Sequence, residues 1–142
     1  MKRTASAKWN GSLKEGKGSL SAPGGVLNNT PYSFAARFGD QPGTNPEELI
    51  AAAHAGCFSM AFSAALGKAG FTPTSIETAA ALSLDQVGAG FEITTIHLEM
   101  TAKIPGIDTA KFQAIAEDAK ANCPVSKVLK GAKITLSAKL AG

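Results

Sequence analysis

An α+β fold, with antiparallel β-sheets wrapped around long central helices, is predicted by three observations. Residues 44–68 form a long and almost wholly apolar stretch, and residues 108–122 repeat apolar side chains at helical spacing. Residues 75–85, 91–103 and 133–140 alternate apolar and polar side chains with period two, which predicts strands with one buried face. This order of strands and helices indicates an α+β architecture.

One domain is expected over residues 1–142, because a chain of this length can bury a hydrophobic core. The content of 44% hydrophobic and 18% charged residues is typical of a globular protein.

The N-terminal part is predicted to be a hairpin followed by an extended run. Residues 5–22 contain two short strands joined by a glycine-rich turn. Tyr32 and Phe34 then occupy alternate positions, which predicts an extended segment with Arg37 on the face opposite the aromatic side chains. Residues 39–45 are rich in turn formers and lead as a loop into the next element.

Residues 44–68 are predicted to be a helix with Asn45 or Thr44 as the N-cap. Pro46 suits the first helical position, and the acidic Glu47 suits the first turn.

The same helix has no polar face between Leu49 and Leu66, so it is expected to be buried on all sides. Its length of about 30 Å is also that of a membrane span, but its charged ends and internal His54 favour a core helix and no membrane association. One chain supplies limited sheet to cover such a helix, and an intertwined homodimer would complete the cover.

The two long strands differ in one respect. Residues 91–103 change the phase of their apolar positions at Thr94 and Thr95, which predicts a β-bulge there. His97 falls on the polar face and is expected to be exposed.

Further along, Asp108 is the predicted N-cap of an amphipathic helix that ends near Asn122. Cys123 then lies near the N-cap of a short helical turn, with Pro124 at its first position. The run 133–140 closes the chain as a strand with one solvated face.

The charge distribution argues against nucleic acid as a partner. The formal charge of +3 comes from 14 basic and 11 acidic residues, and the basic residues are scattered along the chain. The start Met1-Lys2-Arg3 leads into polar sequence without an apolar run, so a cytoplasmic location is expected.

The cysteine content limits the chemistry. Two Cys and two His without paired spacing make a zinc site an unfavourable interpretation, and a reducing compartment disfavours a permanent disulfide. Cys57 and Cys123 are therefore either two buried bystanders or one redox pair.

A reactive cysteine must be a thiolate, which needs positive charge or hydrogen-bond donors nearby. Cys57 is too far along its helix for the N-terminal dipole to act, so Arg37 is the favoured source of charge. His54 is more commonly a satisfied buried histidine, and Glu47 a first-turn residue. Cys123, near a helix N-cap, has the more activating local position. The residues alone leave either cysteine as the nucleophile.

Several ordered runs carry a resemblance to a known family. They are GTNPEELI at 43–50, AAHA at 52–55, CFSM at 57–60, GFTPTSI at 70–76 and CPVS at 123–126, with WNG at 9–11 and RF at 37–38 flanking them. Together these runs resemble the OsmC branch of the OsmC/Ohr family over essentially the whole chain.

The resemblance implies an osmotically inducible, cytoplasmic, two-cysteine peroxidase that reduces organic hydroperoxides and, less well, hydrogen peroxide. Cys57 matches the peroxidatic cysteine and Cys123 the resolving cysteine that forms a disulfide with it. Arg37 matches the arginine that stabilises the thiolate, and Glu47 the carboxylate that orients this arginine. Gly56, where alanine is expected, departs from the pattern but leaves these four positions intact.

The resemblance also implies an intertwined homodimer with active sites at the subunit interface. No cofactor or metal is expected, and a dithiol or a lipoylated protein would serve as reductant. Two other interpretations use the same residues. One is a non-catalytic redox sensor or ligand-binding module, and the other is a structural dimer whose thiols are inert.

Overall fold

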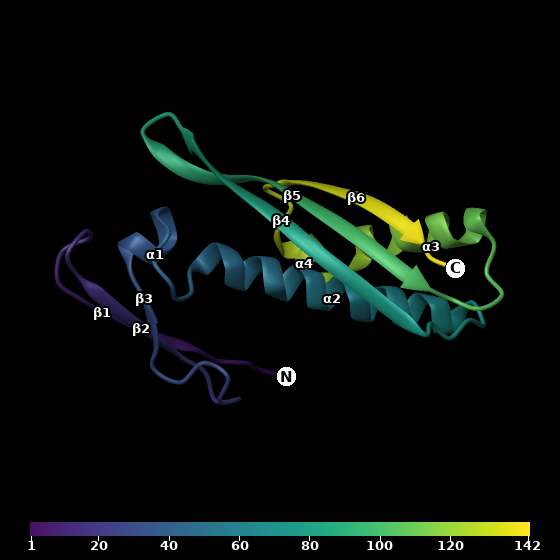
Figure 1. The fold of residues 1–142 in the computed structure, drawn as a ribbon, viewed down its shortest axis with the longest axis horizontal. Coiled ribbons are helices and arrows are strands. Elements are labelled where there is room, and N and C mark those ends of the chain that lie inside the picture. Colours follow the sequence, from purple (N-terminus) through teal and green to yellow (C-terminus); the bar gives the residue numbers. More distant parts are fainter. The chain divides into compact units, whose positions relative to one another are not determined.

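The computed structural model describes residues 1–142, and its elements confirm the α+β class. The chain forms two compact units, Met1–Leu49 and Ile50–Gly142, and a single domain over residues 1–142 stays a prediction. In chain order the elements are β1 Ser6–Asn10, β2 Lys17–Ser21, β3 Thr30–Tyr32, α1 Phe34–Phe38, α2 Pro46–Lys68, β4 Ser75–Val87, β5 Gly90–Lys103, α3 Thr109–Asn122, α4 Pro124–Val128 and β6 Lys133–Leu140 (Figure 1).

The first unit contains a small antiparallel sheet in the order β1-β2-β3, which includes the predicted hairpin. Trp9 and Tyr32 lie on either side of Gly18, and their ring centroids are 5.4 Å apart. A Cβ at Gly18 would lie 2.7 Å from the Trp9 ring, so the contact of the two aromatic rings requires glycine between them.

The predicted extended run through Phe34 is wrong, because residues 34–38 form the short helix α1. The Ser33 hydroxyl accepts a hydrogen bond from the Ala36 N–H at 3.2 Å and caps this helix. Phe34 and Phe38 lie one turn apart with ring centroids 4.9 Å apart, a contact that helical spacing makes possible. Arg37 therefore lies in the last turn of a helix.

Helix α2 begins and ends where the sequence predicts. Asn45 is its N-cap, and its Oδ1 accepts the Glu48 N–H at 2.8 Å. At the other end Gly70 has a φ of +89°, and the Phe71 N–H donates to the Leu66 carbonyl at 2.9 Å. This is a Schellman motif, in which glycine at the left-handed position stops the helix.

The second unit contains the sheet β4-β5-β6. Strands β4 and β5 are antiparallel, and Ser83 pairs with Thr95 while Leu84 pairs with Ile93, which confirms the predicted bulge by leaving Thr94 as the extra residue. Strand β6 is parallel to β5, so the sheet is mixed and not purely antiparallel. The connection through α3 and α4 is long enough to return the chain to the same end of the sheet.

Helices α2 and α3 pack on one face of this sheet (Figure 1). The core cluster consists of Phe58, Phe62, Leu66, Leu98, Met100, Ala102, Ile104, Phe112, Ala116, Ala119 and Cys123.

Asp108 caps α3 as predicted, since its carboxylate accepts the Lys111 N–H at 2.8 Å. His97, expected to be exposed, is half-buried on the other face, where its Nδ1 lies 2.6 Å from the Thr135 hydroxyl.

Within this chain α2 buries only one stripe of its surface, formed by His54, Phe58, Phe62 and Leu66. The sheet covers only one side of this helix, and Met60 on an uncovered side is 76% exposed. The expected burial of α2 on all sides is therefore not met within one chain. By length and composition α2 could also cross a membrane, but that is weak evidence because core helices of soluble proteins pass the same test.

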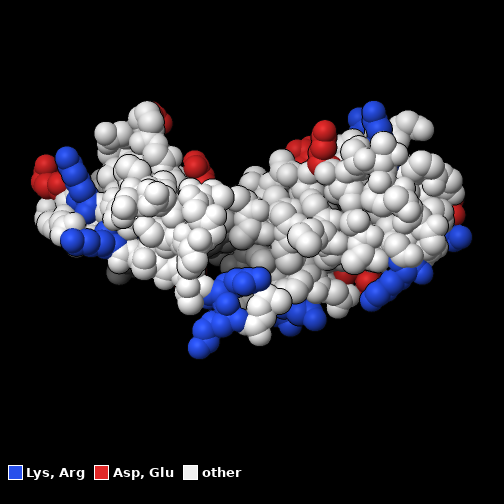
Figure 2. Space-filling view, turned by 90° about the horizontal axis from the view of Figure 1, so that it is seen from below, with Lys and Arg blue, Asp and Glu red and all other residues white.

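Charged side chains are distributed in small groups. On the face shown in Figure 2, basic and acidic groups occur along the surface among a majority of uncharged residues. This distribution agrees with the scattered Lys and Arg residues in the sequence.

Candidate thiol site and arginine pair

The two cysteines lie in contact in the second unit. The Sγ atoms of Cys57 and Cys123 are 2.9 Å apart, and both residues are free thiols. A disulfide bond is about 2.05 Å long, so a shift of about 1 Å would bring the two sulfur atoms to bonding distance. Cys123 is fully buried and Cys57 is half-buried. The structure therefore presents one sulfur atom to its surroundings and keeps the other beneath the surface.

The local sequence explains where Cys57 and Cys123 lie. Cys57 precedes Phe58, which is fully buried in the core and fixes this turn of α2. Cys123 lies between α3 and α4, where its N–H donates to the Ala119 carbonyl at 2.9 Å. Pro124 cannot continue a helical hydrogen-bond ladder, so the chain turns at Cys123 and α4 starts in a new direction.

The environment of Cys57 within this unit does not favour a thiolate. Burial raises the pKa of the Cys57 thiol, and the hydrogen bond and the charge interaction with Cys123 raise it further. The Val125 backbone N–H lowers this pKa by donating to the sulfur, but it is outweighed. A cation is needed to make Cys57 reactive at neutral pH.

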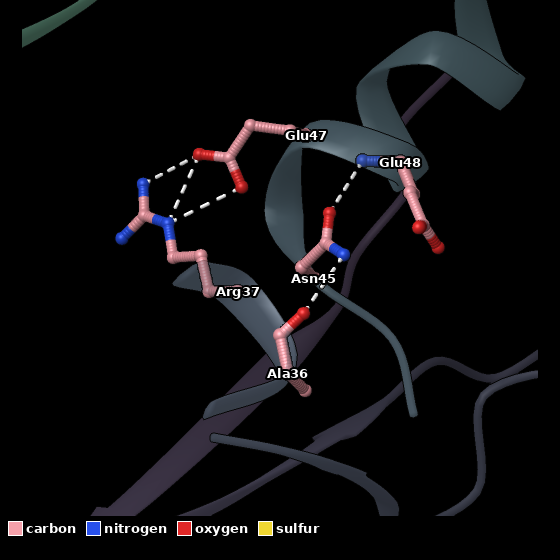
Figure 3. Close-up of polar contacts among 5 residues, drawn as sticks. All are labelled: Ala36, Arg37, Asn45, Glu47 and Glu48. Atoms are coloured by element: carbon pink, nitrogen blue, oxygen red, sulfur yellow. Dashed lines mark hydrogen bonds and ion pairs between the residues drawn. The ribbon is translucent and has the colours of Figure 1, made fainter. Parts of the chain in front are cut away.

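Arg37 and Glu47 form an ion pair in the first unit (Figure 3). Arg37 Nη2 lies 2.7 Å from Glu47 Oε1, and Arg37 Nε lies 3.0 and 3.2 Å from the two carboxylate oxygens. Such a two-pronged contact fixes the plane of the guanidinium group as well as its position. The Arg37 side chain is 39% exposed and that of Glu47 is 14% exposed, so the pair keeps access to solvent.

Asn45 connects the helices that carry this pair. Its Nδ2 donates to the Ala36 carbonyl in α1 at 3.3 Å, while its Oδ1 caps α2 at Glu48 (Figure 3). Asn45 is buried, so this link is shielded from water. It holds the last turn of α1 next to the first turn of α2, where Arg37 and Glu47 meet.

An aromatic cavity adjoins Arg37 in the same unit. It has a volume of about 270 Å³ and is lined by Trp9, Leu13, Tyr32, Ser33, Phe34, Arg37 and Phe38. The Arg37 guanidinium also lies 5.2 Å from the centroid of the Phe38 ring. The cation therefore borders an apolar space.

His54 is buried, and only one of its two ring nitrogens has a hydrogen-bond partner. Its Nε2 lies 2.7 Å from the Ser126 hydroxyl, whereas its Nδ1 has no hydrogen-bond partner. Burial lowers the pKa of His54, which favours the neutral ring. Ser126 was not identified from the sequence, because a single serine 72 positions away carries no signal of this contact.

The four predicted site residues thus form two pairs in different units. Cys57 contacts Cys123 in the second unit, and Arg37 contacts Glu47 in the first. No group of three or more His, Cys, Asp or Glu side chains is arranged to hold a metal ion.

A family model described as "OsmC-like protein" matches residues 39–137. This chain belongs to the OsmC family. The match confirms the resemblance and contains Glu47, Cys57 and Cys123, while Arg37 lies just before it.

Relatives support the OsmC assignment along more of the chain. The chain is 59% identical over 134 residues to the Peroxiredoxin OsmC of Escherichia coli strain K12, covering 94% of this chain and 93% of that one. It is 32% identical over 104 residues to an organic hydroperoxide resistance protein of Xanthomonas axonopodis pv. citri, covering 72% and 70%. A crystal structure of an organic hydroperoxide resistance protein OsmC from Legionella pneumophila matches with a TM-score of 0.68 and 25% identity, covering 96% of each chain.

Proposed function

We propose that this protein is a thiol-dependent peroxidase that reduces organic hydroperoxides through Cys57 and Cys123. The contact of the two sulfur atoms at 2.9 Å is the observation that carries the proposal, because it places a second thiol where an oxidised Cys57 would need it. The names of the Escherichia coli and Xanthomonas relatives, a peroxiredoxin and an organic hydroperoxide resistance protein, support the same chemistry.

The first step is attack of the Cys57 thiolate on the peroxide O–O bond. A sulfur–oxygen bond forms, the O–O bond breaks, and the leaving alkoxide takes a proton to become an alcohol. Cys57 is oxidised by two electrons to a sulfenic acid. Cys57 has the role of nucleophile because it is the half-buried thiol, whereas Cys123 is fully buried.

The second step joins the two cysteines. The Cys123 sulfur attacks the Cys57 sulfur, the S–O bond breaks, and the Cys123 proton leaves with the hydroxyl group as water. The resulting disulfide is less easily overoxidised than the sulfenic acid. An external dithiol or a lipoylated protein then reduces the disulfide through exchange and regenerates both thiols.

Arg37 and Glu47 complete the site. Because burial raises the pKa of Cys57, the thiolate needs a permanent positive charge, and arginine supplies one without a proton to lose. Glu47 holds the guanidinium plane through its hydrogen bonds to Nε and Nη2. The aromatic cavity beside Arg37 suits the organic portion of a hydroperoxide better than hydrogen peroxide, which has none.

An intertwined homodimer brings the two pairs together in this proposal. The uncovered face of α2 supports it, since this face consists of small residues and Met60 and carries no charged side chain. Exposed residues of this face are Ala52, Ala53, Gly56, Met60, Ser63, Ala64 and Gly67. Ser63 is the one hydroxyl among them. A second copy would cover this face and complete each active site at the subunit interface.

The reaction needs no metal or organic cofactor, because both the nucleophile and the resolving group are cysteines. A cytoplasmic location fits the need for a reducing compartment that supplies dithiols. Nucleic acid and membranes have no part in this chemistry.

Consumption of cumene hydroperoxide and of hydrogen peroxide with excess dithiothreitol tests the proposal. We expect many turnovers, a preference for the organic substrate, and loss of turnover in Cys57→Ser by at least about 10³-fold. Cys123→Ser should still form a sulfenic acid at Cys57 after one equivalent of peroxide, which trapping and mass spectrometry would detect.

A single oxidation without further turnover would instead favour the redox sensor. Unchanged rates in Cys57→Ser, or no sulfenic acid at this residue, would overturn the peroxidase.

A further inference from the structure

The His54–Ser126 pair joins α2, which carries Cys57, to α4, which begins directly after Cys123. His54 lies three residues before Cys57 on α2, and Ser126 lies three residues after Cys123, within α4. The chain therefore has two neighbouring links between the same helices, one of nitrogen to oxygen at 2.7 Å and one of sulfur to sulfur at 2.9 Å. Residues three apart share a helix face, so each link lies about one turn from the other.

Helix α4 has little of its own to hold it in place. It contains five residues, too few for an independently stable helix, and its N-cap residue makes no side-chain capping bond. Val128 is 78% exposed, and Val125 is only partly buried against the core. Two polar contacts hold α4 against α2, the hydrogen bond of Ser126 to His54 and the donation of the Val125 N–H to the Cys57 sulfur, and only the first involves an α4 side chain.

The pair is also a costly way to gain stability. Whichever ring nitrogen carries the proton, the buried Nδ1 of His54 remains without a partner. An apolar pair of similar shape would avoid an unsatisfied buried atom and could stabilise the fold as well or better. A contact that carries this cost and lies one turn from both sulfur atoms is placed to do more than hold the core together.

We infer that the His54–Ser126 hydrogen bond is a positioning element for the disulfide step, holding α4 so that Cys123 stays within reach of Cys57. The inference rests on the proposed roles of the two cysteines. His54 and Ser126 touch neither peroxide nor the reacting atoms in this account. They act through the position of Cys123, so they are positioning residues and not catalytic ones.

The two chemical steps should respond differently when the link is lost. Peroxide attack takes place at the Cys57 sulfur and needs no approach by Cys123. The Val125 N–H of α4 donates to this sulfur, but its effect on the pKa of Cys57 is smaller than that of burial, and Ser126 is not part of this contact. Disulfide formation requires Cys123 Sγ to approach along a defined direction, and an α4 that can rotate lowers the effective concentration of this thiol. A slower second step leaves the sulfenic acid exposed to a second peroxide molecule, which oxidises it to a sulfinic acid.

Ser126→Ala is the variant that tests this directly, because it removes one hydroxyl and keeps a good helix former. Stopped-flow measurements would follow sulfenic acid formation with one equivalent of cumene hydroperoxide, and then disulfide formation. We expect the first rate to stay within about twofold and the second to fall about tenfold, as for a lost buried hydrogen bond. Excess peroxide should then give more Cys57 sulfinic acid than in the unaltered protein.

Two further variants separate positioning from general stability. In His54→Gln the amide group can reach about as far as the imidazole Nε2 and can still bond to Ser126, so the disulfide step should remain within about twofold. Ile104→Val removes one methylene from the core away from the pair and serves as the destabilised control. It should lower the unfolding midpoint without slowing the disulfide step.

The equilibrium between the dithiol and the disulfide in dithiothreitol redox buffers gives a readout that needs no peroxide. In Ser126→Ala the effective concentration of the Cys123 thiol at Cys57, which this equilibrium measures, should fall by about tenfold. Unchanged disulfide formation and unchanged equilibrium in this variant would overturn the inference even if the peroxidase is real. A failure of the unaltered protein to consume peroxide would overturn the proposed function, while the redox-buffer comparison would still decide the role of the pair.

Discussion

The thiol pair of the second unit and the ion pair of the first are held by different forces. Cys57 and Cys123 are fixed by apolar packing around a fully buried sulfur, and this burial raises the pKa of the Cys57 thiol. Arg37 and Glu47 are fixed by directed hydrogen bonds in a partly exposed place where the charge stays available. A buried core can position a thiol but does not favour its ionisation, so in the proposed mechanism the second, polar pair supplies the charge.

Replacing Arg37 should have the largest effect, because it tests whether the reactivity of Cys57 depends on the Arg37–Glu47 pair. In Arg37→Met we expect kcat/KM for cumene hydroperoxide to fall about 100-fold, as for loss of one charged group at a reacting centre. Without the cation, nothing offsets the burial that raises the pKa of the Cys57 thiol, so the thiolate fraction at neutral pH falls. The pH dependence of Cys57 alkylation should shift to higher pH.

Arg37→Lys is the matched control for this prediction. This variant keeps the positive charge but loses the two-pronged contact with Glu47. Its kcat/KM should therefore lie between that of Arg37→Met and that of the unaltered protein. An alkylation profile that is identical in Arg37→Met and the unaltered protein would show that the two pairs do not interact.

Replacing Met60 tests whether a second copy brings the pairs together. A buried unpaired carboxylate is strongly destabilising, so Met60→Asp should shift the protein from dimer to monomer and lower activity about tenfold at micromolar concentration. Light scattering with size-exclusion chromatography gives the mass, and activity measured against protein concentration gives the dependence on assembly. Val26→Asp, at another exposed apolar position, is the control and should leave the mass unchanged.

Replacing Glu47 should have the smallest effect. A partly exposed ion pair contributes about 0.2–1 kcal/mol, so Glu47→Gln should lower kcat/KM by about threefold. Glu48→Gln is the control, because it removes the same charge from the same helical turn but makes no contact with Arg37. Equal losses in the two variants would assign the effect to the helix dipole and not to the orientation of Arg37.

Local chemistry made several elements predictable from the sequence. Asn45 before Pro46 marks the start of α2, because capping depends on a few adjacent residues. The bulge at Thr94 was predictable because one extra residue inverts the alternation of apolar side chains. In the candidate site, the resemblance identified the four residues, and the structure shows the contact within each pair.

Features that depend on distant contacts were not predictable. Helix α1 is a different case, because its Ser33 cap is local, but the alternation at Tyr32 and Phe34 fits a strand as well as the start of a short helix. The pattern of β6 is the same whether the strand runs parallel or antiparallel. The His54–Ser126 contact joins residues 72 positions apart, and no periodicity reports such a pairing.

The placement of aromatic side chains gives each unit its own spectroscopic signal. The chain has one tryptophan and one tyrosine, and both Trp9 and Tyr32 lie in the first unit with their rings in contact. Intrinsic fluorescence therefore reports on the unit that contains Arg37, while most of the far-ultraviolet circular dichroism comes from the helices and long strands of the other. Thermal melts recorded by the two methods coincide if residues 1–142 unfold as one cooperative domain and separate if each unit unfolds alone.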